Sequence, residues 1–249
     1  MKRTVLITGA TSGIGKATAI KLAKDYRLIL CGRRTEKLLE LKKELDQITQ
    51  VQILVFDVRD KVGVFGAINQ LDDEWKSIDV LINNAGNAHG LAPFDEADLA
   101  DLEAMIDINV KGLIYVTKAV IPLLKTSFNA HIVNVSSIAG KEVYTNGTTY
   151  CASKAAVESL SKGMRFDLLP YGIKVSNVAP GAVETEFSLV RFKGDQSKAD
   201  SVYQGFQPLV AEDIADAIEN VLNQPEHVQI ADITVLPKAQ ASGTIIYRK

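Results

Sequence analysis

The chain has 249 residues, a formal net charge of −2 at pH 7 and a sequence pI near 6.0. This balance gives no reason to expect binding to nucleic acid or to an anionic membrane. No apolar run approaches the roughly 18 residues that a membrane span requires. Only two cysteines are present, Cys31 and Cys151, so a disulfide framework is not expected and a cytoplasmic location is predicted.

Seven short apolar runs are the strand candidates. They occupy residues 5–7, 28–30, 53–56, 80–82, 132–135, 173–175 and 233–235. We interpret these runs as apolar on both faces rather than alternating, most clearly in the first four, which is typical of parallel strands covered by helices on both faces. Between them lie helical patterns such as 35–45, where Leu38, Leu41 and Leu45 recur at helical spacing. The alternation predicts a single α/β domain over residues 1–249, a Rossmann fold with a doubly wound parallel sheet of about seven strands and helices on both faces.

Residues 180–208 form the one long segment without a clear period. They follow a predicted strand, and ligands bind doubly wound sheets at the carboxyl ends of the strands. Loops of this length in compact domains are usually functional lids or disordered linkers. We expect the segment to be a lid over a substrate site.

A glycine-rich loop follows the first strand directly and opens a helical pattern. Its residues are Thr8, Gly9, Ala10, Thr11, Ser12, Gly13, Ile14 and Gly15. Gly9 permits the tight turn, Gly13 lets the backbone approach a pyrophosphate, and Gly15 allows close packing of helix on strand. The spacing differs from G-x-G-x-x-G, but strand, loop and helix come in the right order for a dinucleotide site.

The end of the second strand indicates which dinucleotide binds. Sites for NAD place an acidic residue there to bind the ribose 2′-hydroxyl, about 20 residues after the loop. This chain has Arg33 and Arg34 instead, and arginine suits a phosphate through its planar fork of donors. The missing acid and the added bases both favour NADP(H), although two arginines before a helix could also be solvated surface residues.

Tyr150 and Lys154 are four residues apart at the start of a helical pattern, so they share one face. A phenol has a pKa near 10, and a nearby cation can lower it by roughly 1–3 units into the range of a general acid or base. The spacing is common by chance. It gains weight from Ser136 and Ser137, which end another predicted strand and present hydroxyls at the same edge of the sheet.

With these motifs in order, the chain resembles the short-chain dehydrogenase/reductase family over essentially its whole length. Further motifs that carry the resemblance are Asp57-Val58, Asn83-Asn84-Ala85-Gly86, Asn109 and Pro180-Gly181. The resemblance implies a catalytic tetrad of Asn109, Ser137, Tyr150 and Lys154. Tyr150 would transfer the proton and Ser137 would hold the substrate oxygen. Lys154 would bind the nicotinamide ribose and depress the Tyr150 pKa, while Asn109 would position a water relay.

The same resemblance implies a cofactor site drawn from much of the chain. Asp57 and Val58 would flank the adenine, Asn84 would lie by the adenine-side ribose, and residues 180–187 would pass the nicotinamide. The predicted cofactor-binding residues are Gly9, Thr11, Ser12, Gly13, Ile14, Gly15, Arg33, Arg34, Asp57, Val58, Asn84, Ala85, Gly86, Tyr150, Lys154, Pro180, Gly181, Val183 and Thr185.

A narrower resemblance lies in the C-terminal third, in residues 186–195, 203–205 and 225–228. These are similar to the NADP-dependent 3-hydroxy acid (serine, allo-threonine) dehydrogenases, which act on small 3-hydroxy acids and the related semialdehydes. Sulfoacetaldehyde reductases show similar patterns. Both substrate classes are anionic, and Arg191 in the expected lid could grip a carboxylate or sulfonate, while Ser137 and Tyr150 would bind the substrate at its reacting oxygen. The basic run Arg191–Lys193 could equally contact solvent or a neighbouring subunit.

The resemblance also implies a homotetramer. His89, His131 and His227 lie far apart in the sequence with no metal-ligand spacing, so no metal site is expected. A rival from another class is a catalytically silent NADP(H)-binding sensor, which would use the fold for binding alone. Such a protein would not need Tyr150 or Lys154, and both are present.

Overall fold

The computed structural model describes residues 2–249 and shows one α/β domain built on a seven-stranded sheet. The strand order is β3-β2-β1-β4-β5-β6-β7, and every neighbouring pair is parallel. The strands are β1 Arg3–Thr8, β2 Tyr26–Gly32, β3 Val51–Val55, β4 Val80–Asn83, β5 His131–Val135, β6 Lys174–Pro180 and β7 Asp232–Val235. All seven predicted strands are present, and the predicted doubly wound sheet is confirmed.

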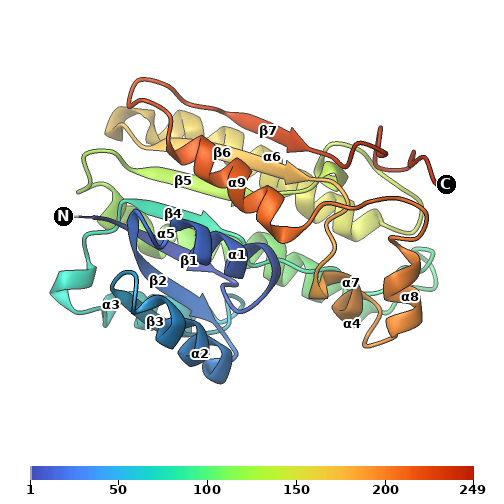
Figure 1. The fold of residues 1–249 in the computed structure, drawn as a ribbon, viewed down its shortest axis with the longest axis horizontal. Coiled ribbons are helices and arrows are strands. Elements are labelled where there is room, and N and C mark those ends of the chain that lie inside the picture. The colour runs from blue at the N-terminus through green and yellow to red at the C-terminus, as the bar shows by residue number, and fades with distance from the viewer. Residues whose placement is uncertain (1) are drawn as a thin grey trace.

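Helices cover both faces of this sheet (Figure 1). They are α1 Gly13–Leu22, α2 Thr35–Leu45, α3 Lys61–Asn69, α4 Leu99–Ile106, α5 Leu113–Leu124, α6 Thr148–Leu168, α7 Glu186–Arg191, α8 Gln196–Ser201 and α9 Ala211–Leu222. Shorter turns of helix occur at Asp73–Trp75, Ile138–Gly140 and Leu169–Tyr171, and a π-helical turn at Asp107–Gly112 joins α4 to α5. No helix within residues 2–249 is both long and apolar enough to cross a membrane.

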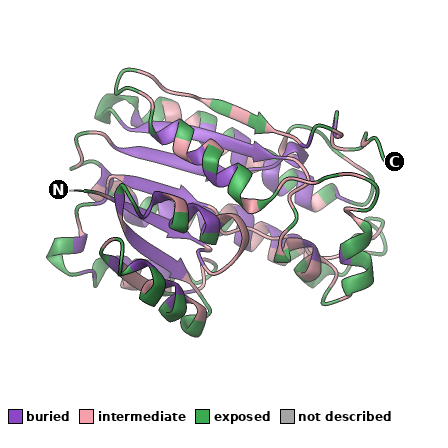
Figure 2. Cartoon of the chain, viewed as in Figure 1, coloured by how far each residue is buried: buried purple, intermediate pink, exposed green. Residues whose placement is uncertain are grey.

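Successive residues of each central strand enter different cores, which explains why the strands are apolar throughout. Val5 and Ile7 pack with α1, α2 and α9 on one face of the sheet. Leu6, between them, packs with α3, α5 and α6 on the other face. All three side chains are fully buried, and Figure 2 shows the strands buried between helices with exposed outer sides. Burial of this kind stabilises the domain by about 1.5–3 kcal/mol for each large apolar side chain.

The largest difference from the predicted strands is at β6. The apolar run suggested residues 173–175, whereas the strand continues to Pro180. Its middle holds the buried polar residues Ser176 and Asn177, which pair with His131, Glu158 and Asp232 through their side chains. Hydrogen-bonded polar groups are tolerated inside a sheet. A prediction based on apolar residues alone therefore placed the end of this strand too early.

Residues 180–208 contain two short helices, α7 and α8, that the sequence pattern did not reveal. Six-residue helices are marginal alone and depend on the structure around them. Thr185 caps α7 by accepting a hydrogen bond from the Phe187 N–H, and Asp195 caps α8 by accepting from the Lys198 N–H. Both helices lie at the carboxyl ends of the strands, as Figure 1 shows.

Candidate active site

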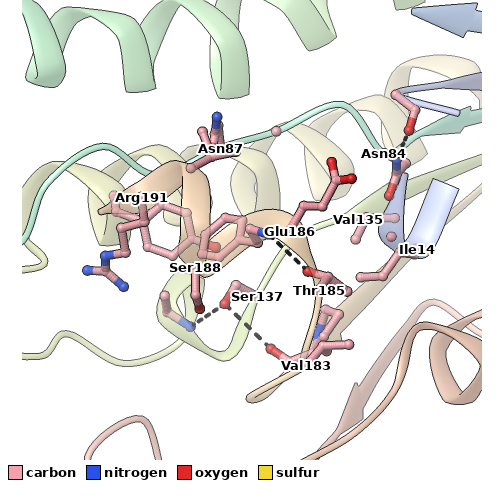
Figure 3. A pocket seen from close by; sticks show the side chains of 18 of the residues that line it. Ile14, Asn84, Asn87, Val135, Ser137, Val183, Thr185, Glu186, Ser188 and Arg191 are labelled. Atoms are coloured by element: carbon pink, nitrogen blue, oxygen red, sulfur yellow. Dashed lines mark hydrogen bonds between the residues drawn. The ribbon is translucent and has the colours of Figure 1, made fainter. Parts of the chain in front are cut away.

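The main cavity lies at the carboxyl edge of the sheet and encloses about 630 Å³. Its walls come from the turns after β1 to β6, from α7 and from the C-terminal segment. Crevices at this edge, where the strand order reverses between β1 and β4, are where doubly wound folds bind ligands. Figure 3 shows side chains from these separate segments converging on one space.

The glycine-rich loop forms one end of the cavity. Gly9 has φ +67°, a left-handed conformation that favours glycine, and a Cβ on Gly15 would collide with the Gly9 carbonyl oxygen. Ser12 precedes α1 in an extended conformation, and within residues 2–249 its hydroxyl makes no capping hydrogen bond. The first N–H groups of α1 are therefore free of a side-chain cap, as a pyrophosphate site at a helix N-terminus requires.

Thr8 and Asn84 fix this loop to the neighbouring strand end. The Thr8 hydroxyl accepts hydrogen bonds from the N–H groups of Asn84 and Ala85, each at 3.0 Å. The Asn84 Nδ2 donates to the carbonyl oxygens of Thr8 at 2.9 Å and Gly9 at 3.3 Å. Asn84 was predicted beside the adenine-side ribose, and these contacts give it a role in holding the phosphate loop as well.

The two arginines after β2 lie in different environments. Arg34 donates to the Thr11 hydroxyl from Nε at 3.1 Å and from Nη2 at 2.8 Å, and to the Ser12 hydroxyl at 2.7 Å. Arg33 lies 3.4 Å from the carboxylate of Asp57. Arg34 therefore joins the second strand to the phosphate loop, where a 2′-phosphate would lie within its reach.

Asp57 follows β3 and is held between two cations. Its carboxylate accepts from Arg59 at 2.6 Å in addition to the Arg33 contact. Burial alone would raise the pKa of Asp57, but hydrogen bonds from Arg59 and the charges of Arg59 and Arg33 lower that pKa to about 2. The carboxylate is ionised at neutral pH and offsets part of the positive charge at this end of the cavity.

Tyr150 and Ser137 lie at the other end of the cavity and are both buried. Ser137 follows β5, accepts a hydrogen bond from the Ala139 N–H at 3.1 Å and donates to the Pro180 carbonyl oxygen at 3.5 Å (Figure 3). The Ser137 side chain also lies close enough to the Tyr150 phenol to lower its pKa. A hydroxyl beside a phenol can hold an oxygen atom between them, which suits transfer of a proton to a substrate carbonyl.

Lys154 lies one turn after Tyr150 on α6 and is 5% exposed. Its Nζ donates to the Val135 carbonyl oxygen at 3.0 Å. Burial lowers the pKa of this ammonium to about 8. A lysine is rarely buried this deeply without a functional or structural partner.

Lys154 is not among the main influences on the Tyr150 pKa. Burial raises the pKa of Tyr150, and Tyr144 adds to the rise. The Ser137 hydrogen bond and the charge of Arg191 oppose it only in part. The reason is that the phenol is desolvated and the Lys154 ammonium is directed at a backbone carbonyl. The cation that does lower this pKa is Arg191, a residue from α7.

Asn109 lies behind Lys154 in the π-helical turn between α4 and α5. Its Nδ2 donates to the Asn87 carbonyl oxygen at 2.8 Å and to the Ser153 hydroxyl at 2.9 Å, and its Oδ1 accepts from the Asn87 N–H at 2.7 Å. Gly86 leaves the space between Asn109 and Lys154, because a Cβ there would come within 3.1 Å of Asn109 Oδ1 and Lys154 Nζ. π-Helical turns are frequent at functional sites.

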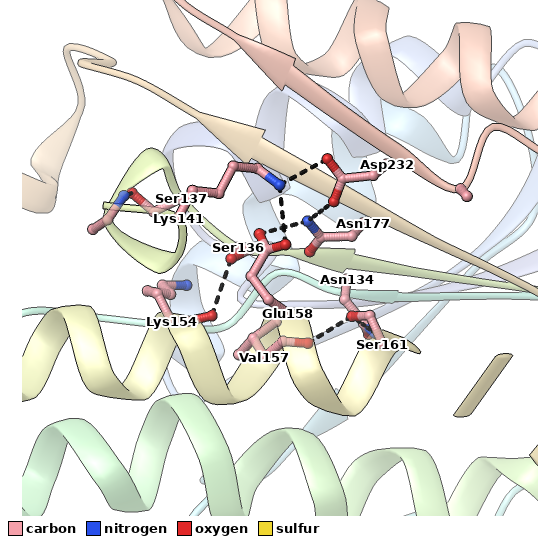
Figure 4. Close-up of polar contacts among 12 residues, drawn as sticks. Asn134, Ser136, Ser137, Lys141, Lys154, Val157, Glu158, Ser161, Asn177 and Asp232 are labelled. Atoms are coloured by element: carbon pink, nitrogen blue, oxygen red, sulfur yellow. Dashed lines mark hydrogen bonds and ion pairs between the residues drawn. The ribbon is translucent and has the colours of Figure 1, made fainter. Parts of the chain in front are cut away.

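A network of charged and polar side chains lies beside the Ser136–Ser137 turn, with Glu158 and Asn177 buried and Lys141 and Asp232 reaching solvent (Figure 4). Lys141 pairs with Glu158 at 3.0 Å and with Asp232 at 2.7 Å. Asn177 donates to the same two carboxylates at 2.7 Å and 2.8 Å. The network ties the turn after β5 to α6, β6 and β7, and it places Glu158 one helical turn after Lys154.

Arg191 ends α7 and lies over the catalytic end of the cavity. Its guanidinium carbon is 5.6 Å from the centre of the Tyr144 ring and 5.8 Å from that of Tyr150. Its Nε donates to the Gly90 carbonyl oxygen at 3.2 Å, and the Gly90 N–H donates to the Arg191 carbonyl oxygen at 2.9 Å. Arg191 is thus held between the loop after β4 and the tyrosines.

The C-terminal segment, residues 240–249, forms part of the cavity wall next to residues 180–208. Gln240 Oε1 accepts from the Ala182 N–H at 2.9 Å. Further along, Arg248 donates to the Val202 carbonyl oxygen at 3.0 Å, and the Lys249 N–H donates to that of Gly205 at 2.7 Å. These bonds fix the end of the chain to residues 180–208.

The structure brings the predicted site residues together, and of them only Gly15 and Asn109 do not line the cavity. Gly15 lies behind the phosphate loop and Asn109 behind Lys154. Sequence reasoning missed Tyr144, Lys141, Glu158 and Glu186. Glu158 had a readable signal, because Tyr150, Lys154 and Glu158 follow one another at four-residue spacing.

The fold and this cavity define a dinucleotide-binding oxidoreductase of the Rossmann class. The parallel sheet places an uncapped helix N-terminus and arginines at one end of a single cavity, and a phenol, a hydroxyl and a buried lysine at the other. Residues 3–195 match the sequence profile of the short chain dehydrogenases. The chain belongs to the short-chain dehydrogenase family.

Similar proteins and structures fit this assignment. The chain is 45% identical to sulfoacetaldehyde reductase 2 of Chromohalobacter salexigens, over 97% of this chain and 96% of that protein. It is 43% identical to the NADP-dependent 3-hydroxy acid dehydrogenase of Schizosaccharomyces pombe, over 99% and 97%. The closed form of a serine dehydrogenase complexed with NADP⁺ superposes with a TM-score of 0.92 at 39% identity, covering 99% of each chain. The predicted family and the predicted kind of relative are both confirmed.

Proposed function

We propose that this enzyme is an NADP(H)-dependent dehydrogenase that interconverts small 3-hydroxy acids and the corresponding semialdehydes. The observation that carries the proposal is one cavity with Arg34 at its phosphate end and Arg191 over Tyr150 at its catalytic end. Support comes from the similar NADP-dependent 3-hydroxy acid dehydrogenase and from the serine dehydrogenase structure that holds NADP⁺. The glycine loop, the uncapped α1 and Arg34 fit such a cofactor.

The bound nicotinamide supplies or accepts the hydride. In the reducing direction, Tyr150 donates its proton to the carbonyl oxygen of the substrate, and Ser137 donates a hydrogen bond to the same oxygen. In the oxidising direction, Tyr150 accepts the proton of the substrate hydroxyl. Burial of the phenol favours its neutral form, so the protein is prepared for proton donation.

Lys154 lines this catalytic end of the cavity, and Asn109 lies behind it. The Val135 carbonyl oxygen holds the Lys154 ammonium, which we expect to bind the hydroxyls of a nicotinamide ribose. A pKa of about 8 lets Lys154 give up and regain a proton near neutral pH. Asn109 fixes the Asn87 backbone and Ser153 around it, and we assign it a positioning role in proton supply.

Arg191 is our candidate for the anionic group of the substrate. Its guanidinium lies within 6 Å of the Tyr150 ring centre, a spacing that suits a small substrate with one carbon between its carboxylate and its carbonyl group. Residues 180–208, which carry Arg191, would then be the substrate lid, with α7 as its inner edge.

A second candidate substrate is sulfoacetaldehyde, the compound named for the similar Chromohalobacter salexigens reductase. A sulfonate presents oxygen acceptors as a carboxylate does, so the same Arg191 could bind it.

We also propose a cytoplasmic homotetramer. Cys31 and Cys151 are both free and buried, which fits a reducing compartment. Helices α5 and α6 expose apolar side chains, including Ile114 at 37% and Phe166 at 78%, which fits helix packing between subunits. Analytical ultracentrifugation tests the assembly, and a monomer at micromolar concentration would refute it.

The test of the function is reduction of NADP⁺ at alkaline pH with L-serine, L-allo-threonine, 3-hydroxypropionate, 3-hydroxyisobutyrate and isethionate, with NAD⁺ as the control. We expect activity with NADP⁺ and at least one hydroxy acid. Activity with isethionate alone would move the enzyme to the sulfonate substrates. Absence of activity on all five would refute the substrate class and redirect the search to neutral aldehydes with NADPH.

A further inference from the structure

The cationic site at the end of β2 already holds an anion from another part of the chain. Glu186, the first residue of α7, pairs with Arg34 at 2.9 Å and with Lys37 at 3.0 Å. Glu186 lines the main cavity beside Thr185 (Figure 3). The Glu186 carboxylate is thus paired with Arg34, which lines the cavity where the cofactor's 2′-phosphate is expected, and with Lys37 one helical turn further on.

The contacts of Arg34 show that a phosphate must compete for this site. Nε and Nη2 of Arg34 are engaged by Thr11 and Ser12 of the phosphate loop, and Nη1 is engaged by Glu186. Lys37 also donates to Glu186. A 2′-phosphate that reaches Arg34 from the cavity therefore meets a guanidinium whose Nη1 is already paired with a negative group.

We propose that Glu186 is a specificity-determining residue that occupies the 2′-phosphate site in the cofactor-free enzyme and is exchanged for that phosphate when NADP(H) binds. This inference rests on the proposed use of NADP(H). It adds that the lid supplies an internal competitor for the group that distinguishes NADP(H) from NAD(H).

The Glu186 carboxylate and the 2′-phosphate compete for these cations rather than share them, because both are negatively charged. The Arg34 hydrogen bond, with help from Lys37, lowers the pKa of Glu186 to about 2, so this carboxylate stays ionised at any working pH. A phosphate monoester carries close to two negative charges at neutral pH, and two anions on one pair of cations repel each other. The dianion gains more from Arg34 and Lys37, so it displaces the carboxylate.

The size of the effect follows from the exposure of the partners. The side chains of Arg34, Lys37 and Glu186 are 42–43% exposed, so solvent screens their ion pairs. Exposed pairs are worth little individually, and breaking two of them weakens phosphate binding by roughly 3- to 10-fold. A cofactor without the 2′-phosphate need not break them, so its affinity does not depend on Glu186.

The test compares two ligands that differ in this phosphate alone, adenosine 2′,5′-bisphosphate and 5′-AMP, by isothermal titration calorimetry. The variant is Glu186→Gln, which keeps the size of the side chain and removes its charge. The matched control is Glu184→Gln. Glu184 is an exposed carboxylate two residues earlier that does not line the cavity, so its removal makes the same change in net charge.

We expect Glu186→Gln to bind the bisphosphate roughly 3- to 10-fold more tightly than wild type at low salt, and 5′-AMP within about twofold. The gain should shrink as ionic strength rises, because salt screens the competing ion pairs. Glu184→Gln should match wild type for both ligands.

Weaker binding of the bisphosphate by Glu186→Gln would overturn the proposal, because it would mean that Glu186 prepares the cations rather than blocks them. Unchanged binding, or an equal gain in Glu184→Gln, would overturn it as well. If the wild-type protein binds both ligands equally, the assignment of NADP(H) is refuted. The inference about Glu186 is then refuted as well, because it rests on that assignment.

Discussion

Glu186 and Arg191 are the first and last residues of the same helix, α7. The carboxylate pairs with Arg34 at the phosphate end of the cavity, and the guanidinium lies over Tyr150 at the catalytic end. At 1.5 Å per residue, the helix spans about 9 Å. A movement that takes Glu186 away from Arg34 therefore acts on the residue above the catalytic tyrosine.

The first prediction separates the two arginines after β2. Arg34→Ala should weaken NADPH binding by about 10-fold or more, because it removes a charge-assisted contact to the 2′-phosphate. Arg33→Ala should have a smaller effect, since Arg33 is paired with Asp57. Fluorescence titration with NADPH and NADH measures both. Equal loss for the two cofactors in Arg34→Ala would contradict the assignment.

The second prediction concerns Tyr150. Tyr150→Phe should lower kcat by roughly 10²- to 10⁴-fold, because it removes the proton donor while keeping the ring. NADPH affinity should stay within about twofold of wild type, since the phenol contributes to chemistry more than to cofactor binding. Turnover and NADPH titration on the same preparation provide the measurement, and a variant that retains wild-type turnover rules Tyr150 out as the acid.

The third prediction tests Arg191 as the anion-binding residue. Arg191→Ala should raise KM for an anionic semialdehyde by 10-fold or more, and KM for a neutral aldehyde of similar size much less, on the order of one lost charged contact. Lys193→Ala is the matched control, because Lys193 is exposed and pairs with Asp101 outside the cavity. If both substrates respond alike, Arg191 acts through the lid and not on the anion.

The fourth prediction is a dependence of stability on pH that comes from Lys154. This side chain has a pKa of about 8 in the folded protein and 10.5 as its ordinary value. Between these values the unfolded chain binds more protons than the folded one, so stability rises with pH. Below pH 8 the cost of burying the charge is present in full, and it disappears above about pH 10.5.

Lys154→Met lacks this cost. The stability gained by Lys154→Met relative to wild type should therefore be larger at pH 7 than at pH 9.5, by about 2 kcal/mol. The lost hydrogen bond to Val135 adds an offset that does not vary with pH. Urea denaturation of both proteins at the two pH values checks this, and a constant difference would contradict the buried charge.

The sheet could be predicted because its strands are apolar on both faces, a pattern that Val5, Leu6 and Ile7 show locally. The phosphate loop and the Tyr150–Lys154 pair could be predicted because each lies within a few consecutive residues. α7 and α8 were not predicted, since helices of six residues depend on packing.

The contact between Glu186 and Arg34 joins residues 152 positions apart, and no spacing in the sequence reports it. The direction of the Tyr150 pKa shift could not be predicted from the sequence either. It depends on how deeply the phenol is buried and on where the Lys154 ammonium points, and only packing decides these. Local motifs thus predicted which groups react, while the electrostatic state of those groups followed from the tertiary structure.

The cavity draws its walls from Thr8 near one end of the chain to Arg248 near the other. Every strand pair in the sheet is parallel and joined by a crossover, so its contacts link distant parts of the sequence and form slowly during folding. A partly folded chain has no complete cofactor site. Cofactor binding therefore selects chains that have finished folding, and by mass action it stabilises all parts of the domain at once.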